Sequence, residues 1–410
     1  MRLTPLAKII LVLLVIGGAI GSYRYWQRSQ SPSGGTRSAG GNAGGSCGFG
    51  LPKIPGFGGG SQGSNSHGAN SNTGDDGQLQ FITSASKKGW IVEQIDKFNA
   101  LPTTKLPVAL KSVETREAMH QILDGKAKPA LWSPSSVIWA DRLAEAYKGK
   151  QLLDTSDGNS YRVILRTPIV FLTTKEKARF LRPLLASPNC WTNIRNLSAG
   201  QKRAPWGNLK WAHADPINAN SGMLALALIL ADYADQTGQG GSIEALANSG
   251  AFITHLKAVE RRIVYNAAVE KGSSALVSSF AADPSRYDFI VTYESDGLRE
   301  VSKNDELAVI YPNPTANSEN AVAVLDGEWM TPAQKEGALA FVKYLAQPEA
   351  ARDGLKEHFR PVRGASLSGE ISRYATNGFR QSYSAIELPP YAALNAAAYK
   401  WRVEIAKKPG

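Results

Sequence analysis

Cysteine is scarce in this sequence, which has only Cys47 and Cys190 in 410 residues. A disulfide framework needs more cysteines, and a structural zinc site needs Cys and His ligands at close spacing. The histidines are spread along the chain as His67, His120, His213, His255 and His358. We therefore expect no metal site and no cofactor, and whether the two cysteines pair stays open.

Dense basic runs and common catalytic motifs are also missing. The net charge of +11 is spread over the chain, whereas nucleic-acid binding favours clustered basic residues with interleaved aromatics, so we expect no nucleic-acid partner. Two Gly-x-Ser-x-Gly matches, at 44–48 and 59–63, lie in low-complexity sequence, although a nucleophile elbow needs a strand before the serine. We therefore expect that the protein is not an enzyme. A hydrolase would need Glu294 to lie close to His213 or His255, so that the two side chains act as general acid and general base.

One long apolar run does occur, at residues 9–22. Arg2 and Lys8 precede it, and an aromatic and basic cluster follows at 23–28, which is typical of a signal anchor. A cleavable signal peptide is the alternative, because small residues close the run. We favour a single-pass anchor at 1–30, with the remaining chain outside the cytoplasm.

Residues 31–77 consist mostly of Gly, Ser, Asn and Pro. Such a segment buries too little apolar surface to offset the conformational entropy that it would lose on ordering, so it is predicted to be a flexible linker. A coil of this length spans roughly 40 Å.

From Leu79 the sequence alternates between strand and helix patterns. Apolar runs at 79–83, 106–113 and 129–132 are predicted strands, and the helix after the second begins at Thr115 and is stopped by Gly125. This alternation predicts α/β architecture with parallel strands, and binding residues just beyond the strand ends. The length exceeds what one core usually organises, so two lobes are expected.

Further along, a helix with an apolar centre is predicted within 215–234. Ser221 is predicted to cap it and to leave the N–H groups of Gly222 and Met223 free at a positive helix end, where an anion could bind.

The remaining strands are predicted at 289–293, 307–311 and 321–325, and a buried strand after Arg166 is predicted to cross between the lobes. Thr331 and Gln334 form a capping-box pattern before the last amphipathic helix. That helix is predicted to be structural.

Four segments carry a resemblance to a known family. They are LWSPSSVIWADRL (131–143), WAHADPINANSGMLAL (211–226), YDFIVTYES (287–295) and the stretch 326–362. Over about residues 79–363 the chain resembles the type II periplasmic solute-binding proteins, in particular the branch that binds molybdate, sulfate and similar oxyanions.

The resemblance implies two hinged α/β lobes that close on a solute. The expected boundaries are 78–165 for the first part of lobe 1, 166–296 for lobe 2, and 297–410 for the second part of lobe 1 with a C-terminal helical tail. In that family, Ser and Thr hydroxyls and helix-start N–H groups hold the ligand.

Carried over by motif, the candidate ligand-binding residues are Ser84, Ser86, Ser133, Ser135, Ser136, Thr167, Asn220, Ser221, Gly222, Glu294 and Ser295. Neutral donors of this kind suit a fully ionised oxyanion. Ordinary N-capping is the alternative explanation for each serine turn, because Ser and Thr are preferred there in any case.

Two features depart from the simplest oxyanion binders. Lys87 and Lys88 follow the first serine turn, where they would attract an anion or, as we favour, form a solvated surface pair. Glu294 would repel an anion unless Arg299 or another cation pairs with it, which leaves an amine-bearing or metal-chelated solute as an alternative.

Together these patterns predict a protein that captures a small anionic ligand for uptake through a membrane permease of the ABC type. A membrane-tethered sensor or adaptor with the same binding fold is the alternative, because a signal anchor suits both.

Overall fold

The computed structural model describes residues 77–363, 366–367 and 369–407. The predicted anchor at 1–30 and nearly all of the predicted linker lie outside this part of the chain. Within the described residues, no helix combines the length and the apolar character that a membrane crossing requires.

The first lobe is built on a mixed sheet in which β1 lies between β2 and β3, parallel to both. The sheet runs in the order β2 (Val108–Ser112), β1 (Leu79–Thr83), β3 (Leu131–Ser133), β8 (Asn317–Val324) and the first part of β4 (Tyr161–Thr174). Its helices are α2 (Lys88–Asn99), α3 (Thr115–Leu123), α4 (Val137–Ala146), α13 (Pro332–Leu345) and α14 (Pro348–Lys356), with the turn η1 (Ala85–Lys87) after β1.

The second lobe is built on the second part of β4, which pairs with β6 (Phe289–Tyr293) and β7 (Leu307–Ile310); β5 (Trp211–Ala212) lies parallel to β6. Its helices are α5 (Lys175–Leu185), α6 (Cys190–Ala199), α7 (Asn220–Thr237), α8 (Ile243–Asn248), α9 (Gly250–Val259), α10 (Ala267–Lys271), α11 (Ser273–Ala282) and α12 (Glu294–Lys303), with the turns η2 (Gly240–Ser242) and η3 (Pro284–Arg286). Residues 223–230 of α7 are buried on every side, which explains their unbroken apolar sequence.

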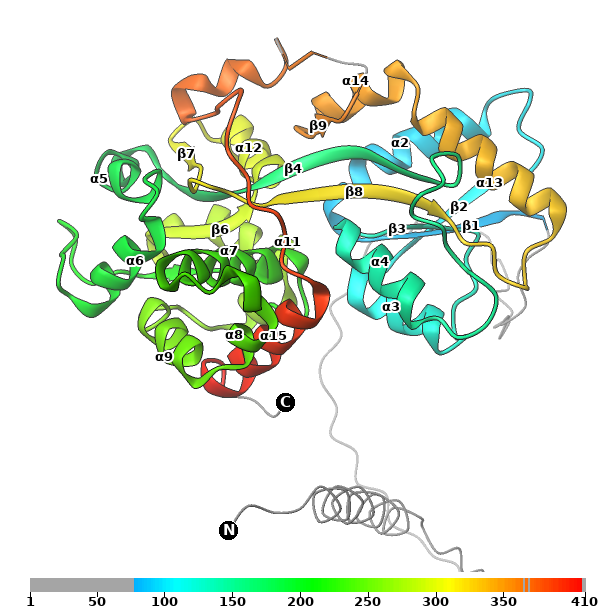
Figure 1. Cartoon of the computed structure of the whole chain (residues 1–410). Helices are drawn as coiled ribbons and strands as arrows, with labels where there is room; N and C mark the ends of the chain where they lie inside the picture. The colour runs from blue at the N-terminus through cyan, green and yellow to red at the C-terminus, as the bar shows by residue number, and fades with distance from the viewer. Residues whose placement is uncertain (1–76, 364–365, 368, 408–410) are drawn as a thin grey trace, which may run out of the picture. The chain divides into compact units, whose positions relative to one another are not determined.

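β4 connects the two lobes, because it belongs to both sheets (Figure 1). Residues up to Pro168 pair with β8 in the first sheet, and residues from Ile169 pair with β6 in the second. Proline has no N–H to donate to a ladder, so Pro168 suits the point where β4 changes partners. The α/β two-lobed fold and the crossing strand are therefore as predicted, although β4 begins earlier, at Tyr161.

The chain returns to the first lobe later than the sequence-based boundary at residue 297. α12 and β7 still belong to the second lobe, because β7 pairs with β4 there. The return runs through β8, and the short strand β9 (Arg360–Pro361) then pairs with β4. After the turn η4 (Ser372–Asn377), the C-terminal helix α15 (Tyr391–Glu404) packs against α7 and α8 of the second lobe (Figure 1).

The capping box predicted at the start of α13 is confirmed. The Thr331 side chain accepts from Gln334 N, and the Gln334 side chain accepts from Thr331 N, so the predicted capping box is present. Behind α13, Phe341 packs edge-on to Phe98 of α2, with ring centroids 4.9 Å apart. The capped helix thus anchors the core of the first lobe.

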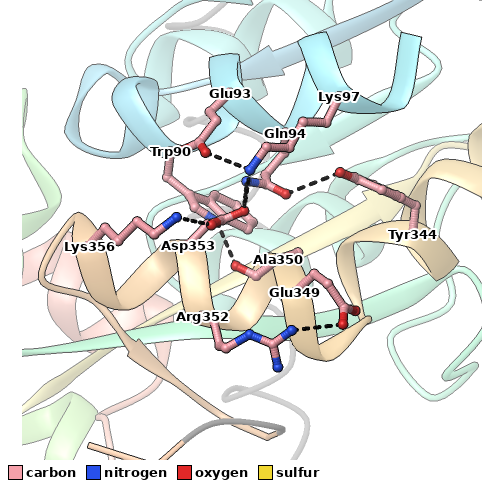
Figure 2. A network of polar contacts seen from close by, with 10 residues as sticks. All are labelled: Trp90, Glu93, Gln94, Lys97, Tyr344, Glu349, Ala350, Arg352, Asp353 and Lys356. Atoms are coloured by element: carbon pink, nitrogen blue, oxygen red, sulfur yellow. Dashed lines mark hydrogen bonds and ion pairs between the residues drawn. The ribbon is translucent and has the colours of Figure 1, made fainter. Parts of the chain in front are cut away.

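A polar network centred on the buried Asp353 joins α2 to α14 (Figure 2). Asp353 accepts hydrogen bonds from Gln94 at 3.0 Å, from Lys97 at 2.7 Å and from Lys356 at 2.7 Å. Burial alone would raise the pKa of Asp353, but these hydrogen bonds outweigh it and lower the pKa to about 2. The ionised carboxylate therefore stabilises the packing of the two helices.

We predict that Asp353→Asn destabilises the fold by about 2 kcal/mol at pH 7, because the three donors lose a charged acceptor. Because the folded pKa is lower than the unfolded one, this contribution is complete above pH 4 and is lost as the pH falls through 2. Urea unfolding followed by circular dichroism measures both effects.

The matched control is Glu336→Gln, which breaks the exposed pair with Lys105 and should cost less than about 0.5 kcal/mol. Equal losses from the two variants would contradict a stabilising role for Asp353.

Candidate functional site

Three turns of the first lobe converge at the carboxyl edge of its parallel strands. Ser84 follows β1, Thr115 follows β2 and Ser135 follows β3. The Ser135 hydroxyl lies 2.7 Å from that of Ser84 and 3.0 Å from that of Thr115, and Ser86 adds a hydroxyl 3.2 Å from Ser84. Neighbouring parallel strands end at the same edge, so their following turns meet there.

Ordinary N-capping does not account for these serines. Ser84 and Ser136 occupy the N-cap positions of η1 and α4, but neither side chain accepts a hydrogen bond from the helix it precedes. Ser84 bonds across to Ser135 instead, and the fully buried Ser136 hydroxyl has no hydrogen-bond partner within the described residues. The polar atoms of these turns face one another and the lobe interface.

The second lobe reaches this cluster through Asn220, the first residue of α7. Its Nδ2 donates to the Ser135 carbonyl at 3.3 Å and to the Tyr293 hydroxyl at 3.1 Å, while its Oδ1 accepts from Trp139 Nε1 at 2.8 Å. Ser318 of β8 also donates to the Ser135 carbonyl. The two lobes are therefore in direct contact at the serine cluster, in a closed arrangement.

The capping prediction for Ser221 is wrong. α7 begins two residues earlier than predicted, at Asn220, with Ala219 in place of Ser221 in the N-cap position. The Ser221 hydroxyl lies 2.6 Å from that of Ser273. Its side chain thus links α7 to α11, and a ligand contact from Ser221 stays a prediction.

Ser133 and Gly222 have clear structural partners. The Ser133 hydroxyl donates to the Ala321 carbonyl at 2.6 Å and so links β3 to β8. A Cβ on Gly222 would lie 2.0 Å from the Ala214 carbonyl oxygen, so only glycine allows the start of α7 to approach the chain this closely. For both residues, a role in binding ligand stays a prediction.

The candidates near the crossing strands form a separate group. Thr167 of β4 donates to the Ser295 hydroxyl at 3.2 Å and accepts from Ser295 N at 3.0 Å. The fully buried Glu294 accepts from Arg360 Nε at 2.7 Å and from Nη2 at 2.6 Å, and also from the Tyr311 hydroxyl.

The cation that pairs with Glu294 is therefore Arg360, whereas Arg299 pairs with Asp296 at 2.7 Å. Because the Glu294 charge is compensated, it does not present a free carboxylate to an anion.

The expectation of a solvated lysine pair is wrong for Lys87 and holds for Lys88, which is exposed. Lys87 is 1% exposed, and its Nζ donates to the Pro134 carbonyl at 3.0 Å and to Asn320 Oδ1 at 2.9 Å. Burial lowers the pKa of Lys87 to about 7, against the opposing effect of Glu114. The turn that follows β3 is therefore in contact with a buried amine, Lys87, which can gain or lose a proton near neutral pH.

The acid and base pair that a hydrolase would need is not assembled here. His213 Nε2 lies 3.1 Å from Glu260 Oε1, and Glu294 is bound to Arg360. His255 is buried beside the ring of Tyr233, with centroids 4.5 Å apart.

The family model for bacterial extracellular solute-binding proteins matches residues 79–359. The chain belongs to this family. It is thus a solute-binding protein of the class whose two lobes enclose a ligand, as the sequence resemblance predicts.

Solved structures of the same fold cover most of the chain. The sulfate-binding protein SubI from Mycobacterium tuberculosis H37Rv is 15% identical, with a TM-score of 0.54 over 81% of this chain and 99% of that chain. A periplasmic thiamin binding protein is 12% identical, with a TM-score of 0.58 over 81% of this chain and 98% of that chain. The periplasmic binding protein AfuA from Actinobacillus pleuropneumoniae, with bound fructose-6-phosphate, is 15% identical, with a TM-score of 0.55 over 82% of this chain and 100% of that chain. At these identities the likeness establishes the fold alone.

A curated relative is the uncharacterized protein Rv1836c of Mycobacterium tuberculosis, which is 26% identical over 239 residues. The match covers 57% of this chain and 33% of that protein, so the chain spans about a third of the length of the relative it matches.

Sequence reasoning missed several members of the cluster. Thr115 follows a predicted strand just as Ser84 does, so its position alone could have identified it. Tyr293 and Ser318 had no such signal, because their place depends on contacts between distant strands.

We predict that Lys87 makes stability depend on pH. Its folded pKa of about 7 lies below its unfolded value, so the unfolded state binds more protons between pH 7 and 10. Over that interval the wild type should gain up to about 1.4 kcal/mol per pH unit relative to Lys87→Met, as measured by urea unfolding.

Lys88→Met, at the exposed neighbour, is the control and should leave the pH dependence as in the wild type. Parallel stability curves for the wild type and Lys87→Met would show that Lys87 is ordinarily solvated.

Proposed function

We propose that this protein captures a small anionic solute between its two lobes, outside the cytoplasm, and delivers it to a membrane permease of the ABC type. The observation that carries this proposal is the hydroxyl cluster of Ser84, Thr115 and Ser135 at converging helix starts, with the cation of Lys87 beneath it.

The charges around the cluster favour an anion. α3 and α4 begin at these turns, and the N-terminal end of a helix carries partial positive charge. Lys87 donates to neutral acceptors, and a nearby anion would favour its protonated, charged form, because its pKa is about 7. Glu294, which would attract an amine-bearing solute, is neutralised by Arg360.

Solute entry requires the closed lobes to open. The hydroxyls now bond one another, and Asn220 bonds the Ser135 carbonyl across the interface. Rotation about β4 and β8, the strands that run between the lobes, would part these contacts and let the solute replace them. An anionic solute would compensate for the hydrogen bonds lost between the lobes. Hydrogen bonds to charged groups contribute about 1.5–3 kcal/mol each, whereas hydrogen bonds between neutral groups contribute about 1 kcal/mol.

Two of the structural neighbours support an anion. SubI is a sulfate-binding protein, and AfuA holds bound fructose-6-phosphate; both of these solutes carry negatively charged oxygens. The thiamin binding protein indicates that the fold also accepts a cation. In this chain the charge of Glu294 is compensated by Arg360 and Lys87 is buried beside the serine turns, so an anionic solute is favoured over a cationic one.

The sequence of residues 1–77 supports a position at the membrane surface. A signal anchor at 1–30 and a linker at 31–77 would hold the binding domain near a permease. They would equally suit a sensor that reports occupancy to a membrane partner. Deletion of the gene separates the two: a transport protein predicts lost solute uptake, and a sensor predicts normal uptake with a lost response.

We predict that sulfate, molybdate or phosphate raises the melting temperature of the wild type more than any sugar or amine does. At one hundred times Kd the stabilisation is about 2.7 kcal/mol. Ser135→Asp should abolish the shift, because it sets a carboxylate among the hydroxyls, and Ser135→Ala should weaken it. A thermal-shift screen measures all three.

The control is Ser302→Asp, at an exposed position of α12, which should keep the wild-type shift. A screen in which sugars alone stabilise the protein would refute the anionic ligand.

A further inference from the structure

Arg116 lies beside the serine cluster, at the seam between the lobes. It is the second residue of α3 and follows Thr115, whose hydroxyl bonds Ser135. Its guanidinium stacks on the Trp139 ring, with Cζ 5.2 Å from the centroid. Trp139 in turn donates to Asn220 of the second lobe. Arg116 is therefore connected to both sides of the proposed site.

The donors of Arg116 are only partly used. Nη1 donates to Asn395 Oδ1 of α15 at 3.0 Å. Nε and Nη2 are buried and have no hydrogen-bond partner among the described residues. The N–H groups of Nε and Nη2 point from the same edge of the guanidinium plane and form the fork that binds two oxygens at once. A buried fork without acceptors is costly.

Elsewhere the chain supplies a carboxylate to the same edge of an arginine. Arg360 donates to Glu294 from Nε at 2.7 Å and from Nη2 at 2.6 Å. Arg166 donates to Glu319 from Nε at 3.1 Å and from Nη2 at 2.7 Å. No side chain of the described part of the chain does this for Arg116. The acceptor that fits must therefore come from outside the described residues, and a bound solute would supply it.

The local charge balance points the same way. Lys87 is buried on a carbonyl and an amide oxygen, and Arg116 donates to the amide oxygen of Asn395. Neither cation donates to a carboxylate, and Glu114 acts on Lys87 only through its charge. An anion between the lobes would give these donors a charged acceptor in a region of low dielectric.

We propose that Arg116 binds the solute directly and is a specificity-determining residue: its Nε and Nη2 fork takes two terminal oxygens carried on one atom, as in a sulfate, phosphate or carboxylate group. This inference rests on the proposed anionic function and names the chemistry that the site selects. Asn395 acts as a positioning residue, because its bond to Nη1 and the Trp139 ring fix the plane of the guanidinium. Asn395 lies beyond residues 79–359, the part of the chain that the family model matches.

The test is isothermal titration of the full chain with sodium sulfate, sodium phosphate and sodium succinate at one fixed ionic strength, which removes general salt effects. For the anion that binds, Arg116→Gln should weaken the affinity by about tenfold or more. Arg116→Lys should recover little of it, because an ammonium is a point charge without a fork. Melting temperatures without ligand check that each variant folds.

The matched control is Arg142→Gln. Arg142 also stacks on an aromatic ring at this seam, with Cζ 5.3 Å from the Tyr391 centroid, but it pairs with Glu145. Its loss should change the affinity by less than about twofold.

The outcomes separate the two proposals. Wild-type affinity in Arg116→Gln, with binding weakened by Ser135→Ala, overturns the role of Arg116 and leaves the anion site standing. Full recovery in Arg116→Lys overturns the two-oxygen fork. Binding of none of the three anions to the wild type overturns the anionic function together with this assignment.

Discussion

The shared strand β4 is the constraint on which the rest of the structure depends. Because one continuous strand supplies hydrogen bonds to both sheets, it holds the lobes together, and Pro168, where its partners change, is the point about which we propose that they rotate. The pair of Glu294 and Arg360 reinforces this point, since Glu294 follows β6 of the second sheet and Arg360 lies on β9 of the first. This buried ion pair therefore joins the two sheets near the crossing.

The chemistry of the site follows from where the strands end. Parallel strands bring Ser84, Thr115 and Ser135 to one edge, and the second lobe presents Asn220 to the same place. Each hydroxyl can donate a hydrogen bond to a neighbouring hydroxyl, as here, or to a ligand, which suits the binding site that we propose. Lys87 beneath them supplies charge without occupying the interface.

Much of the fold could be predicted because its signals are local. The strands at 79–83 and 289–293 have the predicted bounds, since each is an apolar run that ends at polar turn residues. The capping box joins side chains and backbone within four residues. The burial of Lys87 could not be predicted, because its acceptors come from Pro134 and Asn320, far away in sequence. The predicted start of α7 was wrong by two residues, because Asn220 and Ser221 are both common near helix starts.

The most direct test of a hinged, anion-capturing protein is the distance between its lobes in solution. Spin labels at Lys105→Cys in the first lobe and Lys202→Cys in the second, with Cys47→Ser and the buried Cys190 kept, allow this distance to be measured by electron paramagnetic resonance. We expect a broad distribution without ligand that becomes shorter and narrower when the binding anion saturates the protein. One unchanged distribution in both conditions would contradict capture by lobe closure.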